Sequence, residues 1–343
     1  MENRLKLTYL SWTDFNWHAF LLTKSFNAKI IFIKRIRFIK FFPRLVNVAF
    51  DYLIKSIKTI TFIIKNYKNY FFFENPPPIA SVIGLLCKKI NKNFKYVIDA
   101  HNGAFEPPMI NFPFVIKAFN NADAVIVHNN PLRIFLQSKN EFNNCTFFTL
   151  NDPIPEIPDY SIPSYKDKYF LVVTTFHGDE PVEIVLEGIE LFLSKSIDSK
   201  VEFHVSGNYN KSINVYKKFS DNKKIKFLGF VDQETYHREL TNSIGVLTYS
   251  IREMVQQFAP MEALGANKPF ISNRNLTNIE LFDNKMVLTE INPESIAMGI
   301  EEFFMRKGEL EKNIVYLKEQ LTEIRNKDFN NLIRHLKLND AII

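Results

Sequence analysis

The sequence predicts an α/β protein of two doubly wound domains, and three observations support this fold class. The chain has 343 residues, which is too long for one ordinary core and fits two domains. Short β-rich runs alternate with helical patterns, as in βα units with largely parallel sheets. The alternation stops once, at residues 151–168, where four prolines stand without apolar periodicity. We therefore expect an interdomain linker there and a ligand site at a central cleft between the domains.

Residues 1–155 are predicted to form the first domain. Its strands are short runs of β-branched and aromatic residues, which we place at 5–10, 29–33, 70–73, 96–99, 124–127 and 146–149. Apolar spacing typical of helices occurs at 45–65, 79–90, 112–120 and 131–138. Pro76, Pro77 and Pro78 start the second of these helices, since proline is tolerated in a first turn.

Residues 165–307 are predicted to form the second domain. Its strands are expected at 169–174, 201–206, 225–227, 244–249, 270–272 and 286–289, and its helices at 182–193, 233–241, 259–265 and 293–304. Residues 308–343 form a charged tail, helical to about 336, which we expect to pack back on the first domain.

Composition indicates a soluble globular protein, with 46% apolar and 23% charged residues. The cysteines are Cys87 and Cys145 and form no CxxC motif, so neither a disulfide framework nor a zinc site is supported. The first residues lack the apolar core of a signal peptide, and no apolar run approaches the roughly 18 residues that span a bilayer. We expect a cytoplasmic protein, either soluble or held on the inner face of the cell membrane.

Positive charge is concentrated near the start of the chain. Residues 1–70 contain 13 Lys/Arg and three Asp/Glu, a balance of +10, whereas the whole chain carries +6. Together with the Phe/Lys stripe at 30–64, this suits an anionic membrane surface or a phosphate-bearing substrate. A core with a solvated face is the alternative. Nucleic acid is not expected as a partner, because helix-turn-helix, RNP-like and zinc-finger patterns are absent from the sequence.

The segment from Arg252 to Ile271 is the most informative motif. An expected strand leads into a polar loop, then a short helix carrying Glu262, then a second strand. Backbone amides at a helix N-terminus suit a phosphate group, and one turn later Glu262 offers a carboxylate to a ribose diol. Arg252 is the nearest countercharge for a diphosphate. As alternatives, Glu262 is an ordinary acid near a helix start and Arg252 a solvated loop charge.

This segment resembles the donor-binding stretch of family 4 glycosyltransferases, which have a GT-B fold of two Rossmann-like domains. Three further motifs follow the order of that family. Residues 171–180 resemble the first strand and donor loop, with Thr174 and Thr175. Residues 203–208, with Gly207 and Asn208, and residues 225–231, with Phe230 and Val231, resemble the loops that enclose the nucleobase. The resemblance also places Glu253, Gln257 and Phe258 at the donor.

In the first domain, residues 73–78 and 98–102 have a narrower resemblance. They are similar to the Gln-Asn-Pro-Pro and Asp-Trp-His-Asn motifs of the β-mannosyltransferase type that acts on dolichol-diphosphate chitobiose. The sequence departs from the family at Met254, where many retaining members have glutamate, and at 256–259, where the usual loop is rich in glycine. It also departs at Thr174 and Thr175, where Arg and Lys often clamp the diphosphate.

Four residues of the first domain are candidates for the chemistry. His101 ends a strand at the predicted cleft, where it would hydrogen-bond the donor hexose or act as a base. Asp99 is expected to brace its loop. Asp14 and His18 follow the first strand, and as a pair they would deprotonate a sugar hydroxyl or, alternatively, cap the next helix. Glu106 lies on the loop after His101.

The sequence thus predicts an enzyme that moves a hexose from a nucleoside diphosphate sugar to a glycan, with a lipid-linked glycan as the favoured acceptor, in cell-surface polysaccharide or glycoconjugate synthesis. The nucleotide sugar is a co-substrate, and neither a cofactor nor a metal is expected, because helix amides and a cation would stabilise the leaving diphosphate. Two alternatives stay open: a nucleotide-sugar 2-epimerase of the same fold, and an inactive partner of a polysaccharide assembly.

Overall fold

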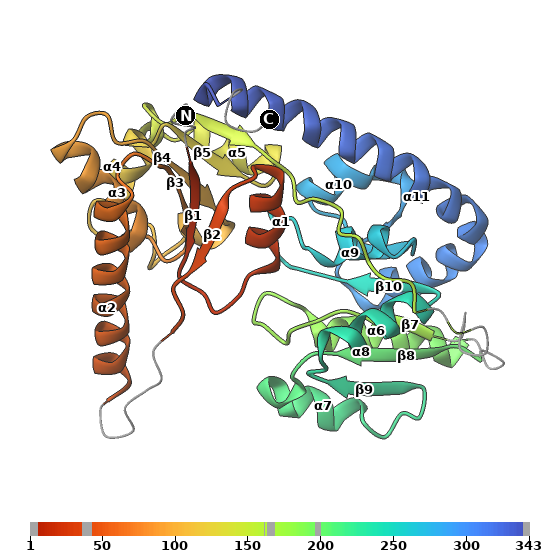
Figure 1. Cartoon of the computed structure of the whole chain (residues 1–343). Helices are drawn as coiled ribbons and strands as arrows, with labels where there is room; N and C mark the ends of the chain where they lie inside the picture. Colours follow the sequence, from red (N-terminus) through yellow and green to blue (C-terminus); the bar gives the residue numbers. More distant parts are fainter. Residues whose placement is uncertain (1–5, 36–42, 161, 163–168, 196–199, 339–343) are drawn as a thin grey trace. The chain divides into compact units, whose positions relative to one another are not determined.

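The chain forms two compact units, drawn in Figure 1. The computed structural model describes residues 6–35, 43–160, 162, 169–195 and 200–338. The first unit comprises residues 1–153 and 325–343, and the second comprises residues 154–324. Parts of the predicted linker (161 and 163–168) and of the Phe/Lys stripe (36–42) lie outside the described residues.

The first unit is built on a parallel sheet in the order β2-β1-β3-β4-β5-β6. Its strands are β1 (Leu7–Ser11), β2 (Lys29–Phe32), β3 (Tyr70–Asn75), β4 (Tyr96–Ala100), β5 (Ala124–Val127) and β6 (Phe147–Thr149). Its helices are α1 (Trp17–Ser25), α2 (Arg44–Lys65), α3 (Ile79–Ile90), α4 (Val115–Asn121) and α5 (Asn130–Gln137), with 3-10 turns at Asn102–Phe105 and Asn140–Phe142.

Alternate strand residues of this sheet face opposite layers of helices, as a pleated sheet requires. Tyr9 and Phe72 belong to a buried cluster with residues of α1 and with Leu332 and Leu336 near the C-terminus. On the other face, Phe71 contacts Phe62 of α2, and α3 comes so close that a Cβ on Gly84 would lie 2.6 Å from the Phe73 ring. Both faces are therefore covered, which explains the nearly continuous apolar runs of the strands.

The second unit has a parallel sheet in the order β12-β11-β10-β7-β8-β9. Its strands are β7 (Tyr169–Val172), β8 (Glu202–Ser206), β9 (Ile225–Gly229), β10 (Gly245–Thr248), β11 (Phe270–Asn273) and β12 (Val287–Thr289). Its helices are α6 (Val182–Lys195), α7 (Ile213–Phe219), α8 (Gln233–Asn242), α9 (Ala259–Gly265), α10 (Leu276–Phe282) and most of α11 (Pro293–Leu336), with 3-10 turns at Tyr209–Ser212 and Asp283–Lys285. Residues of α6 and α11 cover one face, and residues of α8, α9, α10 and α11 cover the other.

The strands predicted from the sequence all form, and the α/β fold of two parallel sheets is confirmed. One helix prediction was wrong: residues 293–304 and 308–336 form a single helix. Arg306 lies where the break was expected and pairs with Glu302 at 2.5 Å and Glu309 at 2.7 Å. The helix continues through Gly308, where, apart from neighbouring backbone, nothing in the described part of the chain lies within 4 Å of the position of a Cβ. The predicted helices also left out α7 and α10, and α1 was implied only by the capping alternative for Asp14 and His18.

Candidate functional site

The carboxyl ends of the strands gather polar side chains in both units, and each unit is described by itself. In doubly wound sheets, ligands bind outside these ends, at the point where the strand order reverses. In the first unit that point lies between β1 and β3, and in the second between β7 and β10. Almost all of the residues predicted as functional follow strands at these ends.

His18 is the centre of the polar cluster in the first unit. It lies in the first turn of α1, whose preceding residue Asn16 accepts a hydrogen bond from the Ala19 amide at 3.4 Å and donates one to Glu74 of β3. The two imidazole nitrogens of His18 contact two carboxylates: Nδ1 pairs with Asp152, and Nε2 lies 3.2 Å from Asp99 Oδ2. The start of α1 is thus fixed to the ends of β3, β4 and β6.

The electrostatics of this cluster favour an ion pair. Burial by itself would lower the pKa of His18, but the carboxylates of Asp152 and Asp99 hold it well above the usual range. Burial would raise the pKa of Asp99, yet His18 and His128 hold it well below its usual value. In the same way His18 lowers the pKa of Asp152 to about 2 against the effect of burial. His18 is therefore a buried imidazolium between two carboxylates.

Asp99 connects the cluster to the sheet. It is fully buried at the end of β4 and accepts a hydrogen bond from the Tyr9 hydroxyl of β1. Its Oδ1 lies 3.3 Å from His128 Nε2. The sequence predicted a brace for one loop, whereas the structure shows a carboxylate that holds side chains following β1 and β5 as well.

His101 is the accessible member of the cluster. Its side chain is 32% exposed, compared with 9% for His18 and 5% for His128. The imidazole rings of His18 and His128 lie 4.8 and 4.7 Å from its own, and its Nε2 is 3.6 Å from Glu74 Oε1. Its amide donates to the Asn75 carbonyl at 2.9 Å, which fixes the turn after β4. A ligand can thus meet the exposed part of the His101 ring, whereas its Nε2 is buried and has no hydrogen-bond partner among the described residues.

Two members of the cluster, His128 and Asp152, were not among the predicted residues. His128 follows β5 as His101 follows β4, and its Nδ1 lies 3.3 Å from the Leu150 carbonyl. The sequence signal that could have identified His128 was its position directly after a predicted strand, as for His101. Asp152 follows β6 inside the proline-rich stretch, where the sequence indicated a linker, so nothing local marked it.

The predicted pair of Asp14 and His18 is wrong. Asp14 is exposed and accepts a hydrogen bond from the Arg35 amide at 3.0 Å, while His18 takes its carboxylate partners from residues 81 and 134 positions away. Asp14 is also not the cap of α1, which is Asn16. Glu106 is exposed on the loop after His101.

The cluster also has the composition of a metal site. One ligand atom from each of His18, Asp99, His101 and His128 lies within 4.8 Å of the others. Both nitrogens of His18 and both oxygens of Asp99, however, already contact partners within the cluster. A metal ion would compete with these ion pairs for the same atoms.

In the second unit, the predicted donor loop after β7 closes around its own acid. The Glu180 carboxylate accepts hydrogen bonds from the Thr174 hydroxyl at 2.7 Å and from the amides of Thr175 and His177 at 2.8 and 3.0 Å. These groups would otherwise be donors for an anion. The loop borders a cavity of about 300 Å³ with the start of α6.

Gly207 brings the loop after β8 against this donor loop. Its φ is +101°, and a Cβ there would lie 2.1 Å from the Thr174 carbonyl oxygen, so only glycine fits. Asn208 caps the following 3-10 turn by accepting from the Asn210 amide. After β9, Phe230 is 89% exposed and Val231 is partly buried. An aromatic ring left in solvent at a strand end suits stacking on a ligand ring.

Glu262 is partly buried in the first turn of α9 and accepts a hydrogen bond from the Tyr236 hydroxyl at 2.8 Å. Burial raises the pKa of Glu262 to about 7, although that hydrogen bond acts in the opposite direction. Tyr236 was not predicted. A carboxyl group with one neutral partner and a raised pKa can accept further hydrogen bonds from a diol.

The loop after β10 is tied to its neighbours. Arg252 Nε lies 3.2 Å from Asp179 Oδ2, Glu253 accepts from the Leu276 amide at 3.3 Å, and Gln257 donates to the Tyr249 carbonyl at 3.1 Å. Phe258 packs against the core and leads into α9 without a side-chain cap. Arg252 is therefore paired with an acid of the predicted donor loop. This differs from the sequence alternative in which Arg252 was a solvated loop charge.

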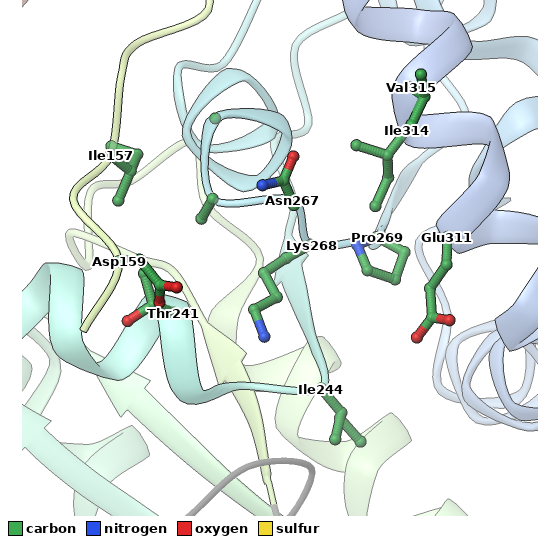
Figure 2. A pocket seen from close by; sticks show the side chains of 12 residues that line it. Ile157, Asp159, Thr241, Ile244, Asn267, Lys268, Pro269, Glu311, Ile314 and Val315 are labelled. Carbon is green, nitrogen blue, oxygen red and sulfur yellow. The ribbon is translucent and has the colours of Figure 1, made fainter. Parts of the chain in front are cut away.

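A cavity of about 490 Å³ lies at the opposite edge of the second sheet (Figure 2). Ile244 and Pro269, which directly precede β10 and β11, line it together with Lys268 and Glu311. It is thus at the amino ends of the strands, away from the predicted donor motifs.

No protein-family model and no curated protein matches the sequence. Solved structures match it over nearly the whole chain. Sucrose-phosphate synthase from Thermosynechococcus elongatus aligns with a TM-score of 0.71 and 12% identity, over 97% of this chain and 99% of that one. HepE of Anabaena, crystallised with UDP and glucose, aligns with a TM-score of 0.67 and 12% identity, over 96% and 99%. A glycosyltransferase from Rickettsia africae aligns with a TM-score of 0.66 and 13% identity, over 98% and 99%.

The chain has the GT-B fold. At these identities the likeness is one of fold, and it confirms the predicted fold class. The narrower resemblance to the chitobiose-specific mannosyltransferase type stays a prediction.

Proposed function

We propose that the protein is a hexosyltransferase that uses a nucleoside diphosphate sugar and a glycan acceptor. The observation that carries this proposal is the His18–Asp99–His101–His128–Asp152 cluster at the carboxyl edge of the first sheet, in a GT-B chain. Similar structures crystallised with UDP and with UDP-glucose support a nucleotide sugar as the donor.

The proposed division of roles follows the two units. The second unit binds the donor, with Glu262 at the ribose and the loops after β7 and β10 at the diphosphate. His101 contacts the reacting sugar, either as a hydrogen-bond donor to the hexose or as the base for the acceptor hydroxyl. The buried imidazolium of His18 and its two carboxylates are positioning residues, because they fix the electrostatic environment of His101 without reaching solvent.

We propose a lipid-linked glycan as acceptor, in cell-surface polysaccharide or glycoconjugate synthesis at the inner face of the membrane. Transfer is proposed to need no metal ion, since loop amides and Arg252 stabilise the leaving diphosphate.

A panel of nucleotide sugars, followed by NMR with and without a glycan acceptor, tests the proposal. Transfer, or slow hydrolysis of one sugar without acceptor, is expected, and both persist in a chelator. Inversion of the free nucleotide sugar at C2 would instead indicate an epimerase, and no reaction with any sugar would indicate an inactive partner. Loss of activity in the chelator, restored by one metal ion, would contradict the metal-independent reaction.

A further inference from the structure

Helix α2 packs on the first unit with its polar side inward. Four polar residues at a spacing of four, Asn47, Asp51, Lys55 and Thr59, are at most 9% exposed. Lys55 pairs with Asp51 at 3.1 Å and donates to the Trp12 carbonyl at 3.0 Å. The Trp12 indole donates to the Thr59 hydroxyl at 3.0 Å. These polar contacts attach α2 to the segment after β1, and the helix lies beside α3 in the first unit (Figure 1).

The opposite side of α2 is an exposed apolar stripe. It consists of Val46, Phe50, Leu53, Ile57, Ile60 and Ile64, which are between 42% and 68% exposed. Their spacing of four and three residues places them on one face along most of the helix. A surface helix ordinarily buries such a face, and a contiguous exposed stripe of this kind marks an interaction surface.

Charge identifies the partner of this stripe. Lys58 and Lys65 of α2 and Lys68 just after it are exposed, whereas the one acidic residue from 44 to 68, Asp51, is buried against Lys55. Two copies joined along the stripe would bring lysines together without acidic partners. An anionic lipid surface can accommodate both the apolar stripe and the lysines. The apolar side chains enter the acyl boundary, while the ammonium groups contact the anionic headgroups.

We propose that α2 is a docking helix that lies in the surface of an anionic membrane. Its 22 residues extend about 33 Å along that surface. Exposed Tyr67, with Lys68 Nζ 5.9 Å from its ring centre, lies at the end of the helix and fits the headgroup level. No helix in the described part of the chain is long and apolar enough to cross a bilayer. The inference deepens the proposed function, on which it rests only for the link to a lipid-linked acceptor.

Sedimentation of the full chain with vesicles tests the inference. Binding to phosphatidylcholine vesicles that contain phosphatidylglycerol is expected, with salt weakening it and phosphatidylcholine alone binding far less. The variant Phe50→Ser/Ile57→Ser should bind about tenfold more weakly or worse, because two apolar side chains no longer enter the membrane. Lys58→Glu/Lys65→Glu should bind weakly and lose the salt dependence.

The matched control is Met298→Ser/Met305→Ser, which removes two exposed apolar side chains of the second unit and should bind like the wild type. Circular dichroism checks that every variant is folded. Three results would overturn the inference: no vesicle binding, equal binding to neutral and anionic vesicles, or a wild-type dimer that Phe50→Ser/Ile57→Ser dissociates. Hydrolysis or transfer measured without vesicles keeps the tests separate, since the α2 variants should keep that activity if the proposed function holds.

Discussion

The carboxyl edges of the two sheets are built differently. In the first unit, side chains in or directly after five strands, β1, β3, β4, β5 and β6, hold one another in a buried network, and His101 alone among its three histidines is substantially exposed. In the second unit, the polar groups pair within one loop or with the next, as Glu180 does with Thr174 and Thr175, and the Glu180 side of these pairs remains partly exposed. A network fixed by distant strands suits chemistry that needs set charges, whereas locally paired loops can exchange partners for a ligand.

The largest effect is expected where the network is cut. Asp99→Asn removes a buried carboxylate from the imidazolium of His18 and should lower the free energy of unfolding of the first unit by about 3–5 kcal/mol. Urea unfolding followed by tryptophan fluorescence measures this unit alone, because Trp12 and Trp17 are the only tryptophans of the chain. Asp14→Asn, an exposed matched control in the same unit, should change it by less than about 1 kcal/mol. Equal effects of the two substitutions would contradict the network.

The contribution of Asp152 to the stability of the first unit should depend on pH. Its pKa is held near 2, below the unfolded value of about 3.9, so its ion pair stabilises the folded state above that value. Asp152→Asn should therefore cost about 2–3 kcal/mol at neutral pH. The difference from the wild type should shrink as pH falls from about 4 towards 2, as the carboxylate of the wild type takes up its proton. A difference that is constant with pH in the same fluorescence assay would mean that Asp152 acts by packing.

Local pattern predicted much of this architecture, because strands buried on both faces are continuous apolar runs. The cluster depended on contacts that local pattern does not contain: the partner of His18 was predicted to be Asp14, four residues away, whereas its partners are Asp99 and Asp152.

The orientation of α2 could not be predicted from the sequence for a related reason. Its polar residues Asn47, Asp51, Lys55 and Thr59 have the spacing of a solvated helix face. Their low exposure, and the contacts of Lys55 and Thr59 with Trp12, show that this face is buried.

A smaller effect is expected at the second unit. Glu262→Gln should weaken binding of a nucleoside diphosphate by about 1.5–3 kcal/mol, because the charge-assisted bond to the ribose is lost. The wild-type affinity should rise as pH increases through about 7, since a diol binds the carboxylate better than the protonated acid. Calorimetry across that range checks both effects. Affinity that is unchanged in Glu262→Gln would remove Glu262 from the donor site.

We propose that His101 performs chemistry while the second unit binds the donor. Turnover and nucleotide affinity should be measured on one preparation of His101→Ala, with His335→Ala, an exposed histidine of the same unit, as control. We expect His101→Ala to lower turnover by about 10²–10⁴ and to leave nucleotide affinity and the unfolding transition nearly unchanged, because His101 acts mainly in the transition state. Full turnover in His101→Ala, or a lower melting temperature with normal specific activity of the folded protein, would contradict it.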